Sequence, residues 1–359
     1  MGFCVFNSEP YFNAGIAVAE MLGRANFLAL VGGGKQPKFP QNKVVIWDDA
    51  KEKAVITLEF RTPVQSVRLS RTRIVVVLRN SVHIYSFSSP PEKVSAFETT
   101  DNTPGLCCLG TSFIAFPGRT PGQVQLVEAA RRNVSIIPAH AAPLRALALS
   151  ANEELLATAS ETGTLIRIFS TANCARVAEL RRGVDHATIF SLAISPSSTL
   201  LAVTSDKSTL HIFDLPHALD AAHPEPTNSE RQRRTLSNAS IANAGVDEGE
   251  SQKWGILGKI PMMPRVFSDV YSFTSAHFEM GDEPVSSAGS ALPPSANAIM
   301  TGIPGGRPAK GVIGWTSDES LIILGAGRDG RWERFLIGED EEGKRRCFRE
   351  GWRRYLGQS

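Results

Sequence analysis

Short hydrophobic stretches alternate with turn residues along most of the chain, and two of the resulting units repeat each other clearly. The first unit covers residues 144–169 and the second residues 189–213, so their first positions are 45 residues apart. Each contains an apolar stretch, a polar turn and a strand of alternating apolar and polar residues, which is the pattern of a β-hairpin. Self-similarity at 40 to 45 residues predicts a β-propeller, whose four-stranded blades bury their faces against each other.

Four further units carry the same pattern, at residues 26–49, 64–87, 105–128 and 312–336. Residues 2–7 (GFCVFN) are typical of the last strand of another unit. We therefore predict an all-β, seven-bladed, WD40-like β-propeller that spans residues 1–359 as a single domain and has an incomplete first blade. An incomplete blade would leave strand edges unpaired, which puts the closure of the ring in question.

Two insertions interrupt the repeats. Residues 216–270 lie within one blade, between the strand that ends at Phe213 and a strand near Tyr271, and residues 281–308 form a polar loop before the last unit. Residues 216–250 are rich in Pro, Ser, Asn and charge and are predicted to be disordered. Apolar residues return at 254–267. They either enter the interface of a bilayer or pack against the propeller, and the candidates for membrane insertion are Trp254, Ile256, Leu257, Met262, Met263 and Phe267.

Composition narrows the function further. A formal net charge of +2 and a hydrophobic fraction of 42% fit a globular protein and give no general case for nucleic-acid binding. No stretch reaches the roughly 18 apolar residues of a membrane span, so membrane contact would be peripheral. The five cysteines form no CxxC pair, which predicts a reducing, cytoplasmic setting without disulfides, zinc or another cofactor. Because GxSxG and HExxH are absent, we do not expect an enzyme.

Candidate chemistry gathers in the two best-matched units and in the turn between them. Their alignment equates two serines, two threonines, and an arginine with a histidine: Ser160 with Ser205, Thr164 with Thr209, and Arg167 with His211. The turn adds Arg181 and Arg182. Adjacent side chains of a strand point to opposite faces, so we expect these two arginines to enter different solvent-filled grooves between blades. Guanidinium groups fit phosphate oxygens, which predicts two anion sites.

Structural explanations for the same residues stay open. An arginine pair is often part of a solvated surface, and the hydroxyl groups of Thr164 and Thr209 and the ring of His211 are also suited to hydrogen bonds within a blade. His140 follows a Pro-Ala pair before an apolar strand, a setting in which histidine is often structural. The glycine run before Lys35 lacks the spacing of a phosphate-binding loop and is interpreted as a hairpin turn.

The motif LRRG at residues 180–183, with its flanking segments ATASETGTLIRIFST and LAVTSDKSTLHIF, resembles the PROPPIN family of WD-repeat propellers that bind polyphosphoinositides. The segments LALVGGGKQPKFPQNKVVIWDD, AFPG and IPAH extend this resemblance over nearly the whole chain outside the insertions. LRRG together with NKVVIWDD is similar to the branch that contains human members three and four and the short fungal relatives.

The resemblance implies two lipid headgroup sites, for phosphatidylinositol 3-phosphate or 3,5-bisphosphate, on adjacent blades. The first would use Thr158, Ser160, Gly163, Thr164, Arg167 and Arg181, with His140 at its edge. The second would use Arg182, Gly183, Ser205, Thr209 and His211. His186 is a further candidate for the second site.

The same resemblance implies a phosphoinositide effector that recruits autophagy proteins to membranes. It would be peripheral on the phagophore assembly site and on endosomal and vacuolar membranes, and its partners would include a bridge-like lipid-transfer protein that docks away from the lipid sites. The alternative from a different class is a WD-repeat scaffold that binds only proteins, with the arginines contacting an acidic peptide. A test of binding to vesicles with and without 3-phosphoinositide separates the two.

Overall fold

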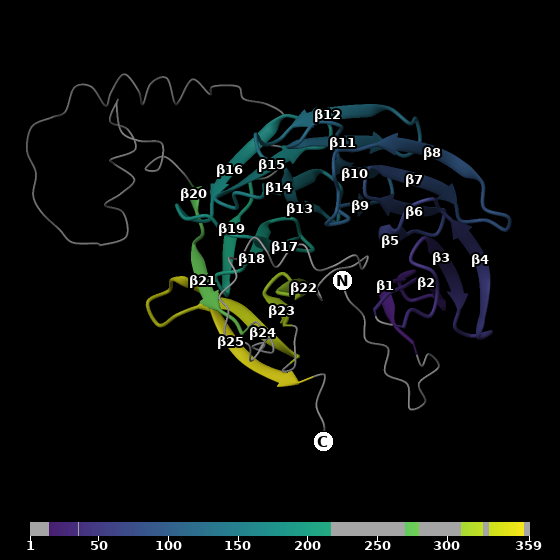
Figure 1. Cartoon of the computed structure of the whole chain (residues 1–359). Coiled ribbons are helices and arrows are strands. Elements are labelled where there is room, and N and C mark those ends of the chain that lie inside the picture. The colour runs from purple at the N-terminus through teal and green to yellow at the C-terminus, as the bar shows by residue number, and fades with distance from the viewer. Residues whose placement is uncertain (1–13, 35, 217–269, 280–309, 326–329, 355–359) are drawn as a thin grey trace, which may run out of the picture.

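The computed structural model describes residues 14–34, 36–216, 270–279, 310–325 and 330–354. These residues form strands and no helix, and the strands make six sheets that follow one another around a common axis (Figure 1). The prediction of an all-β propeller is confirmed, and each of the six predicted units coincides with one sheet. Residues 2–7, on which the prediction of a seventh, incomplete blade rests, lie outside the described residues, as do residues 217–269 and 280–309.

We number the sheets 1 to 6 in chain order. Sheet 1 contains β1 (Ile16–Met21), β2 (Phe27–Gly32), β3 (Lys43–Asp48) and β4 (Lys53–Glu59). Sheet 2 contains β5 (Val64–Leu69), β6 (Arg73–Leu78), β7 (Ser81–Ser86) and β8 (Lys93–Glu98). Sheet 3 contains β9 (Cys108–Leu109), β10 (Phe113–Pro117), β11 (Gln123–Glu128) and β12 (Val134–Pro138).

Sheet 4 contains β13 (Leu144–Leu149), β14 (Leu155–Ser160), β15 (Leu165–Ser170) and β16 (Arg176–Arg181), with β20 (Val270–Tyr271) added at its outer edge. Sheet 5 contains β17 (Ile189–Ile194), β18 (Leu200–Ser205), β19 (Thr209–Asp214) and β21 (Thr274–His277). Sheet 6 contains β22 (Val312–Ser317), β23 (Ser320–Leu324), β24 (Arg331–Glu339) and β25 (Arg345–Arg354). Within each sheet the strands follow one another in chain order, and neighbours are antiparallel except for β20 beside β16. The first strand of each sheet lies near the axis and the last at the rim (Figure 1).

The core consists of apolar layers between neighbouring sheets. Leu156 and Phe169 of sheet 4 pack with Ile137 of sheet 3, whereas Ile168 and Leu180 of sheet 4 pack with the facing strands of sheet 5. Since successive side chains of a strand point to opposite faces, the odd-numbered residues of β15 face sheet 3 and the even-numbered residues face sheet 5. This alternation decides which neighbouring sheet each predicted site residue faces.

The segment after the long insertion joins two sheets at the rim. Tyr271 was expected within a strand of the interrupted blade, but β20 pairs in parallel with β16 of the preceding sheet, so that Tyr271 lies opposite Arg181. The chain then crosses to sheet 5, where β21 pairs antiparallel with β19. Figure 1 shows β20 and β21 in green, linking the outer edges of sheets 4 and 5.

One position of the third strand links each sheet to the one before it. We call it the clamp position: the third-strand residue that pairs with the fourth residue of the second strand. From sheet 2 to sheet 6 it holds His83, Gln125, Arg167, His211 and Glu333. In three of these sheets the side chain bonds to backbone at the end of the preceding sheet's outer strand or within two residues after it: Gln125 to the Glu98 carbonyl (2.8 Å), Arg167 to the Ala139 carbonyl (2.6 Å) and Glu333 to the Glu279 amide (2.7 Å).

The two remaining clamp residues are histidines. His83 packs edge-on against Phe60, the residue that follows β4, with 5.5 Å between the ring centroids. His211 instead bonds to Ser272, in the segment that leads into the outer strand of its own sheet, with 3.1 Å between Nδ1 and Oγ. The clamp position is therefore a polar seam between sheets, and two of the predicted site residues belong to it.

The carboxylate of Glu153, in the turn between β13 and β14, links sheet 4 to the turn between β9 and β10 of sheet 3. Its removal is expected to destabilise the fold. Glu153 accepts hydrogen bonds from the backbone amides of Thr111, Ser112 and Phe113 at 2.5, 2.8 and 2.9 Å. We expect Glu153→Ala to lower the free energy of unfolding by about 2 kcal/mol, since three amides lose a charged acceptor. The control variant Glu154→Ala should change the free energy of unfolding, measured in urea, by less than about 0.5 kcal/mol. Equal urea midpoints for the two variants would contradict a stabilising role of the Glu153 hydrogen bonds.

Candidate anion-binding junctions

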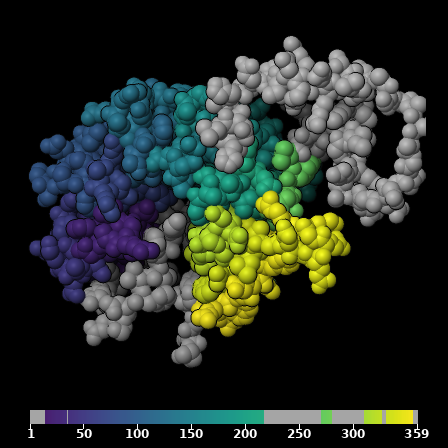
Figure 2. Space-filling view, turned by 180° about the vertical axis from the view of Figure 1, so that it is seen from behind, coloured from purple at the N-terminus to yellow at the C-terminus, as the bar shows by residue number. Residues whose placement is uncertain are grey.

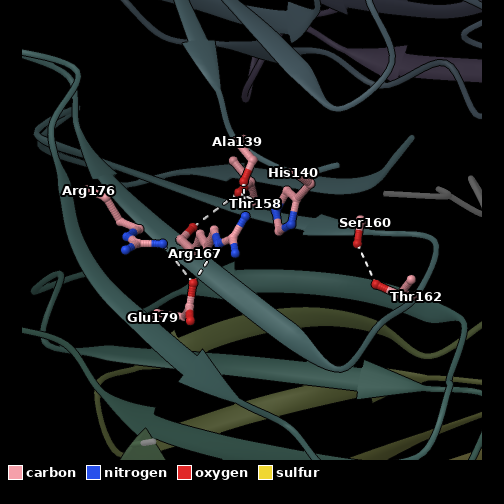
Figure 3. Close-up of polar contacts among 8 residues, drawn as sticks. All are labelled: Ala139, His140, Thr158, Ser160, Thr162, Arg167, Arg176 and Glu179. Carbon is pink, nitrogen blue, oxygen red and sulfur yellow. Dashed lines mark hydrogen bonds and ion pairs between the residues drawn. The ribbon is translucent and has the colours of Figure 1, made fainter. Parts of the chain in front are cut away.

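The residues predicted for the first headgroup site meet between sheets 3 and 4, which we call junction 3/4. Arg167 of β15 pairs with Thr158 of β14 on one side and with Glu179 of β16 on the other. Arg181 pairs with Leu165, so it shares the face of sheet 4 that is directed towards sheet 3. His140 enters the same junction from the connection between β12 and β13 (Figure 3).

Arg167 is held firmly at this junction. Its Nε lies 2.7 Å from Oε2 of Glu179, and its Nη1 donates to the Ala139 carbonyl at 2.6 Å. The same carboxylate oxygen accepts from Nη1 of Arg176 at 2.8 Å (Figure 3). Sequence reasoning missed Glu179 and Arg176, because residues three apart in a regular strand point to opposite faces, and the register shift in the pairing of β15 with β16 is not visible in the sequence. Glu179 partly neutralises the arginine that the first site was expected to offer.

His140 and Thr158 form a short hydrogen-bonded chain beside Arg167. The Thr158 hydroxyl donates to the Arg167 carbonyl at 3.2 Å, and Nε2 of His140 lies 2.9 Å from the same hydroxyl oxygen. Because the hydroxyl proton is used, the ring nitrogen acts as the donor. Burial lowers the pKa of His140 to about 4, and the Arg167 charge lowers it further while Glu179 opposes. His140 is therefore a neutral hydrogen-bonding group at neutral pH.

The turn between β14 and β15 supplies the remaining residues of this set. Ser160 is buried, and its hydroxyl lies 2.7 Å from that of Thr162. Gly163 has a φ of 63°, and a Cβ there would lie 1.7 Å from the Ala187 carbonyl oxygen. The glycine thus has a packing role, because it lets the turn press against the connection between sheets 4 and 5. The backbone carbonyl of Thr164 accepts a hydrogen bond from the backbone amide of Arg182 at 3.0 Å.

Arg182 was expected to face a solvent-filled groove, and the structure contradicts this expectation. Only 9% of the residue is exposed. Its Nε donates to the Gly163 carbonyl at 2.8 Å, and its Nη2 donates to the Asp185 carbonyl. A buried guanidinium needs such acceptors, because desolvation without partners is costly. Burial lowers the pKa of Arg182, while Asp206 and Asp185 act in the opposite direction.

Arg182 lies between sheets 4 and 5, together with the second predicted set, at what we call junction 4/5. Ser205 is fully buried, with its hydroxyl oxygen 3.3 Å from that of Thr209. Burial lowers the pKa of His211 to about 4, and the nearby Arg182 is the next cause. His211 faces sheet 4 because it pairs with Val203, which packs in the core layer between sheets 4 and 5. Because its pKa is lowered, His211 is also neutral at neutral pH.

The structure thus places the two arginines on opposite sides of sheet 4 and divides the first predicted set: Thr158, Arg167 and His140 meet at junction 3/4, whereas the backbone carbonyls of Gly163 and Thr164 bond to Arg182 of junction 4/5. Gly183 differs from Gly163, since a Cβ added to it would meet nothing within 4 Å. No packing contact in the described part of the chain explains this glycine, and space adjoins the arginine pair there. His186 is exposed in the same connection. The insertion candidates from Trp254 to Phe267 lie outside the described residues.

Exposed apolar side chains surround the arginine pair. Val184 is 66% exposed, and Val270 and Tyr271 of β20 are 53% and 48% exposed. Val184 follows Arg182 by two residues, and Tyr271 lies opposite Arg181 in the parallel strand pair. The rim beside junctions 3/4 and 4/5 is therefore both cationic and apolar.

Two other kinds of site are absent from the described residues. No group of three or more His, Cys, Asp or Glu side chains there is arranged to hold a metal ion, and no helix long and apolar enough to cross a membrane is found in the same ranges. A cavity of about 380 Å³ lies between sheets 5 and 6, lined by Asp214, Asp318, Glu319, Glu339, Arg345 and four neighbours. None of the predicted headgroup residues lines it.

Known proteins resemble this chain over most of its length. A sequence profile of the PROPPIN family matches residues 21–236. SVP1-like protein 2 of Emericella nidulans is 62% identical over 337 residues, which cover 94% of this chain and 99% of that protein. SVP1-like protein 2 of Neurospora crassa is 46% identical over 392 aligned positions, covering 100% of this chain and 90% of the relative.

Solved structures share the fold. Hsv2 of Kluyveromyces lactis superposes with a TM-score of 0.65 at 23% identity, covering 95% of this chain and 87% of that one. KlAtg21, solved in complex with the coiled-coil of AgAtg16, gives a TM-score of 0.61 at 18% identity, with coverages of 98% and 89%. The family profile and the close relatives together settle the assignment: the chain belongs to the PROPPIN family of phosphoinositide-binding, autophagy-related β-propellers.

Proposed function

We propose that this protein is a phosphoinositide effector that binds phosphatidylinositol 3-phosphate and 3,5-bisphosphate through junctions 3/4 and 4/5. The observation that carries the proposal is the arrangement around LRRG. Arg181 and Arg182 lie on opposite sides of sheet 4. The Arg181 face also carries Arg167 and Thr158, to which His140 is bonded, and Arg182 lies at junction 4/5 with Ser205, Thr209 and the neutral His211. Phosphate oxygens accept from guanidinium groups, while serine, threonine and imidazole donors suit the remaining oxygens and the inositol hydroxyls.

Two sites on one rim suit a protein that attaches reversibly to a membrane. A single headgroup site binds weakly, but two sites on one rigid body raise the overall avidity by about 10² to 10⁴ through effective concentration. The junctions are adjacent because sheet 4 contributes to both. One bilayer surface therefore reaches both of them at the same time.

Apolar contacts supplement the headgroups in this proposal. Val184, Val270 and Tyr271 are exposed beside the arginines, at the rim that would face the bilayer. Aromatic and aliphatic side chains at this depth gain from entering the membrane interface. Residues 254–267, which precede β20 in the chain, are proposed to add a larger apolar contact of the same kind.

Attachment to the membrane would serve the recruitment of autophagy proteins. The family membership supports this role, and the structure of KlAtg21 with the coiled-coil of AgAtg16 gives one example of such a partner. We propose that the protein acts peripherally on the phagophore assembly site and on endosomal and vacuolar membranes. A bridge-like lipid-transfer protein is a further proposed partner, docking away from the two junctions.

The first test replaces the arginines singly. Arg181→Thr should reduce sedimentation with vesicles that contain phosphatidylinositol 3-phosphate at least tenfold. Arg182→Thr should reduce binding too, but it should also lower the free energy of unfolding by about 2 kcal/mol, because two backbone carbonyls lose their charged donor.

Arg131→Thr, on the exposed connection between β11 and β12, is the matched control for the loss of one positive charge and should bind as the wild type does. Undiminished sedimentation of Arg181→Thr would argue against the proposal. Binding by the wild type that is equal with and without the 3-phosphoinositide would favour a scaffold that binds proteins alone.

The second test concerns Glu179, which forms ion pairs with Arg167 and Arg176 at junction 3/4. Glu179→Gln removes a charge that competes with phosphate, so affinity for the soluble headgroup should rise about three- to tenfold, or about 1 kcal/mol. Glu161→Gln, in the exposed turn after β14, makes the same change of charge without an ion pair in the structure. Isothermal titration calorimetry that finds an equal gain for both variants would contradict a specific role of Glu179.

The third test separates the two roles of Arg167. Arg167→Ala leaves the Ala139 carbonyl without its donor and should lower the free energy of unfolding by about 1 to 3 kcal/mol. Arg167→Gln should retain most of the stability, because Gln125 makes the corresponding bond in sheet 3. Both variants lose the charge and should bind the headgroup more weakly. If urea unfolding gives the two variants the same loss of stability, the clamp assignment is wrong.

A further inference from the structure

Two arginines of junction 3/4 share a single carboxylate oxygen. Oε2 of Glu179 lies 2.7 Å from Nε of Arg167 and 2.8 Å from Nη1 of Arg176. Figure 3 shows the two guanidinium groups approaching this carboxylate from two sides. Phosphate oxygens accept hydrogen bonds from guanidinium groups in the same way. The carboxylate of Glu179 therefore stands where an oxygen of a bound phosphate group would fit.

Both of these arginines lie on the side of sheet 4 that carries Arg181. Glu179 pairs with Arg167, and Arg181 follows Glu179 by two residues, so these three side chains share the face directed towards sheet 3. The register shift in β15 and β16 places Arg176 opposite Phe169, which packs in the core layer between sheets 3 and 4. The position of Arg181 is about 6.6 Å from that of Glu179 along the strand, at about 3.3 Å per residue. Junction 3/4 thus offers two neighbouring places for an anion.

Arg167 and Arg176 keep donors for a ligand. A guanidinium group has five N–H donors. Arg167 uses Nε on Glu179 and Nη1 on the Ala139 carbonyl, and Arg176 uses Nη1 on Glu179. Among the described residues, no acceptor bonds to Nη2 of either arginine. The side chain of Arg176 is 52% exposed and that of Glu179 is 25% exposed, so a ligand reaches this pair from solvent.

The start of β16, where Arg176 lies, is not covered at its outer edge. β20 pairs only with the last two residues of β16, Val270 with Leu180 and Tyr271 with Arg181. In the part of the chain that the structure describes, no other strand pairs with that edge. Figure 2 shows the green residues of β20 and β21 as a narrow strip between the teal surface of sheets 4 and 5 and the yellow surface of sheet 6.

Junction 4/5 differs in its charges. Arg182 uses Nε and Nη2 on backbone carbonyls, and Asp206 and Asp185 both act on its charge. The clamp residue there is the neutral His211. Three arginines accompany one glutamate at junction 3/4, whereas one arginine lies close to two aspartates at junction 4/5. An anion of higher charge is therefore more favourable at junction 3/4.

We propose that Arg167 and Arg176 form a second phosphate subsite of junction 3/4, which Glu179 fills until a headgroup with two phosphate groups displaces its carboxylate. One phosphate binds beside Arg181, and the second takes the place of the carboxylate between the two other arginines. A phosphate group carries about −1.5 to −2 charges, against −1 for a carboxylate, so both contacts become stronger.

A headgroup with one phosphate binds beside Arg181 and leaves Glu179 in place. This inference rests on the proposed function and deepens it, because it makes Arg176 and Glu179 the residues that distinguish a 3,5-bisphosphate from a 3-phosphate. The carboxylate acts as an internal competitor that only the more highly charged headgroup removes.

The test is isothermal titration calorimetry of the full chain with dibutanoyl phosphatidylinositol 3-phosphate and with the dibutanoyl 3,5-bisphosphate. Arg176→Gln should weaken the tighter of the bisphosphate affinities about three- to tenfold and change the monophosphate affinity less than about twofold. Glu179→Gln should increase the bisphosphate affinity at least about twofold more than the monophosphate affinity, because only the bisphosphate has to displace the carboxylate.

Arg131→Gln is the matched control, since Arg131 is exposed and makes an i, i+3 ion pair with Glu128 at 3.8 Å, as Arg176 does with Glu179. It should leave both affinities unchanged, and urea unfolding verifies that all variants are folded. Equal losses for the two lipids in Arg176→Gln, no loss for the bisphosphate, or equal gains in Glu179→Gln would each overturn the inference while the proposed function stands. A wild-type protein that binds neither lipid would overturn both.

Discussion

Contact between neighbouring sheets is the constraint on which the rest of this structure depends. No sheet can bury both of its faces alone, so each relies on an apolar layer shared with the next sheet. Leu180, Ile168 and their neighbours between sheets 4 and 5 are almost fully buried, and each such side chain contributes about 1.5 to 3 kcal/mol. Within the third strands these layers are interrupted by polar contacts at the clamp position, where Gln125, Arg167 and Glu333 bond to the preceding sheet.

The proposed headgroup sites lie where this structural seam reaches the surface, which gives their residues two tasks. Arg167 holds sheet 4 to the connection after sheet 3, its carbonyl accepts from Thr158, and its charge acts on His140. Arg182 fastens the turn at Gly163 to the connection that follows it. Low exposure and fixed hydrogen bonds limit how far these side chains move, so the sites are preorganised. Preorganisation lowers the entropy lost on binding.

The two junctions are not equivalent in charge. Glu179 makes an ion pair with Arg167 at 2.7 Å in junction 3/4, whereas in junction 4/5 the clamp residue is a neutral histidine beside Arg182. The outer edges differ as well. At the edge of sheet 4, β20 brings Tyr271 beside Arg181, while the edge of sheet 6 is a long strand whose Arg345, Arg346 and Arg349 are paired with carboxylates. One propeller therefore presents surfaces of different chemistry around its rim.

The sequence by itself determined the repeat, the all-β fold, the position of each of six sheets and the opposed directions of Arg181 and Arg182, because the two-residue period of a strand is a local property. It also brought Thr158 and Arg167 to one junction and Ser205 and His211 to the next, since aligned units repeat the same strand pattern. Tertiary structure decided the rest. The burial of Arg182, the ion pair of Arg167 with Glu179 and the pairing of β20 with β16 depend on backbone carbonyls and edges contributed by distant segments. The period of a single strand carries no information about such partners.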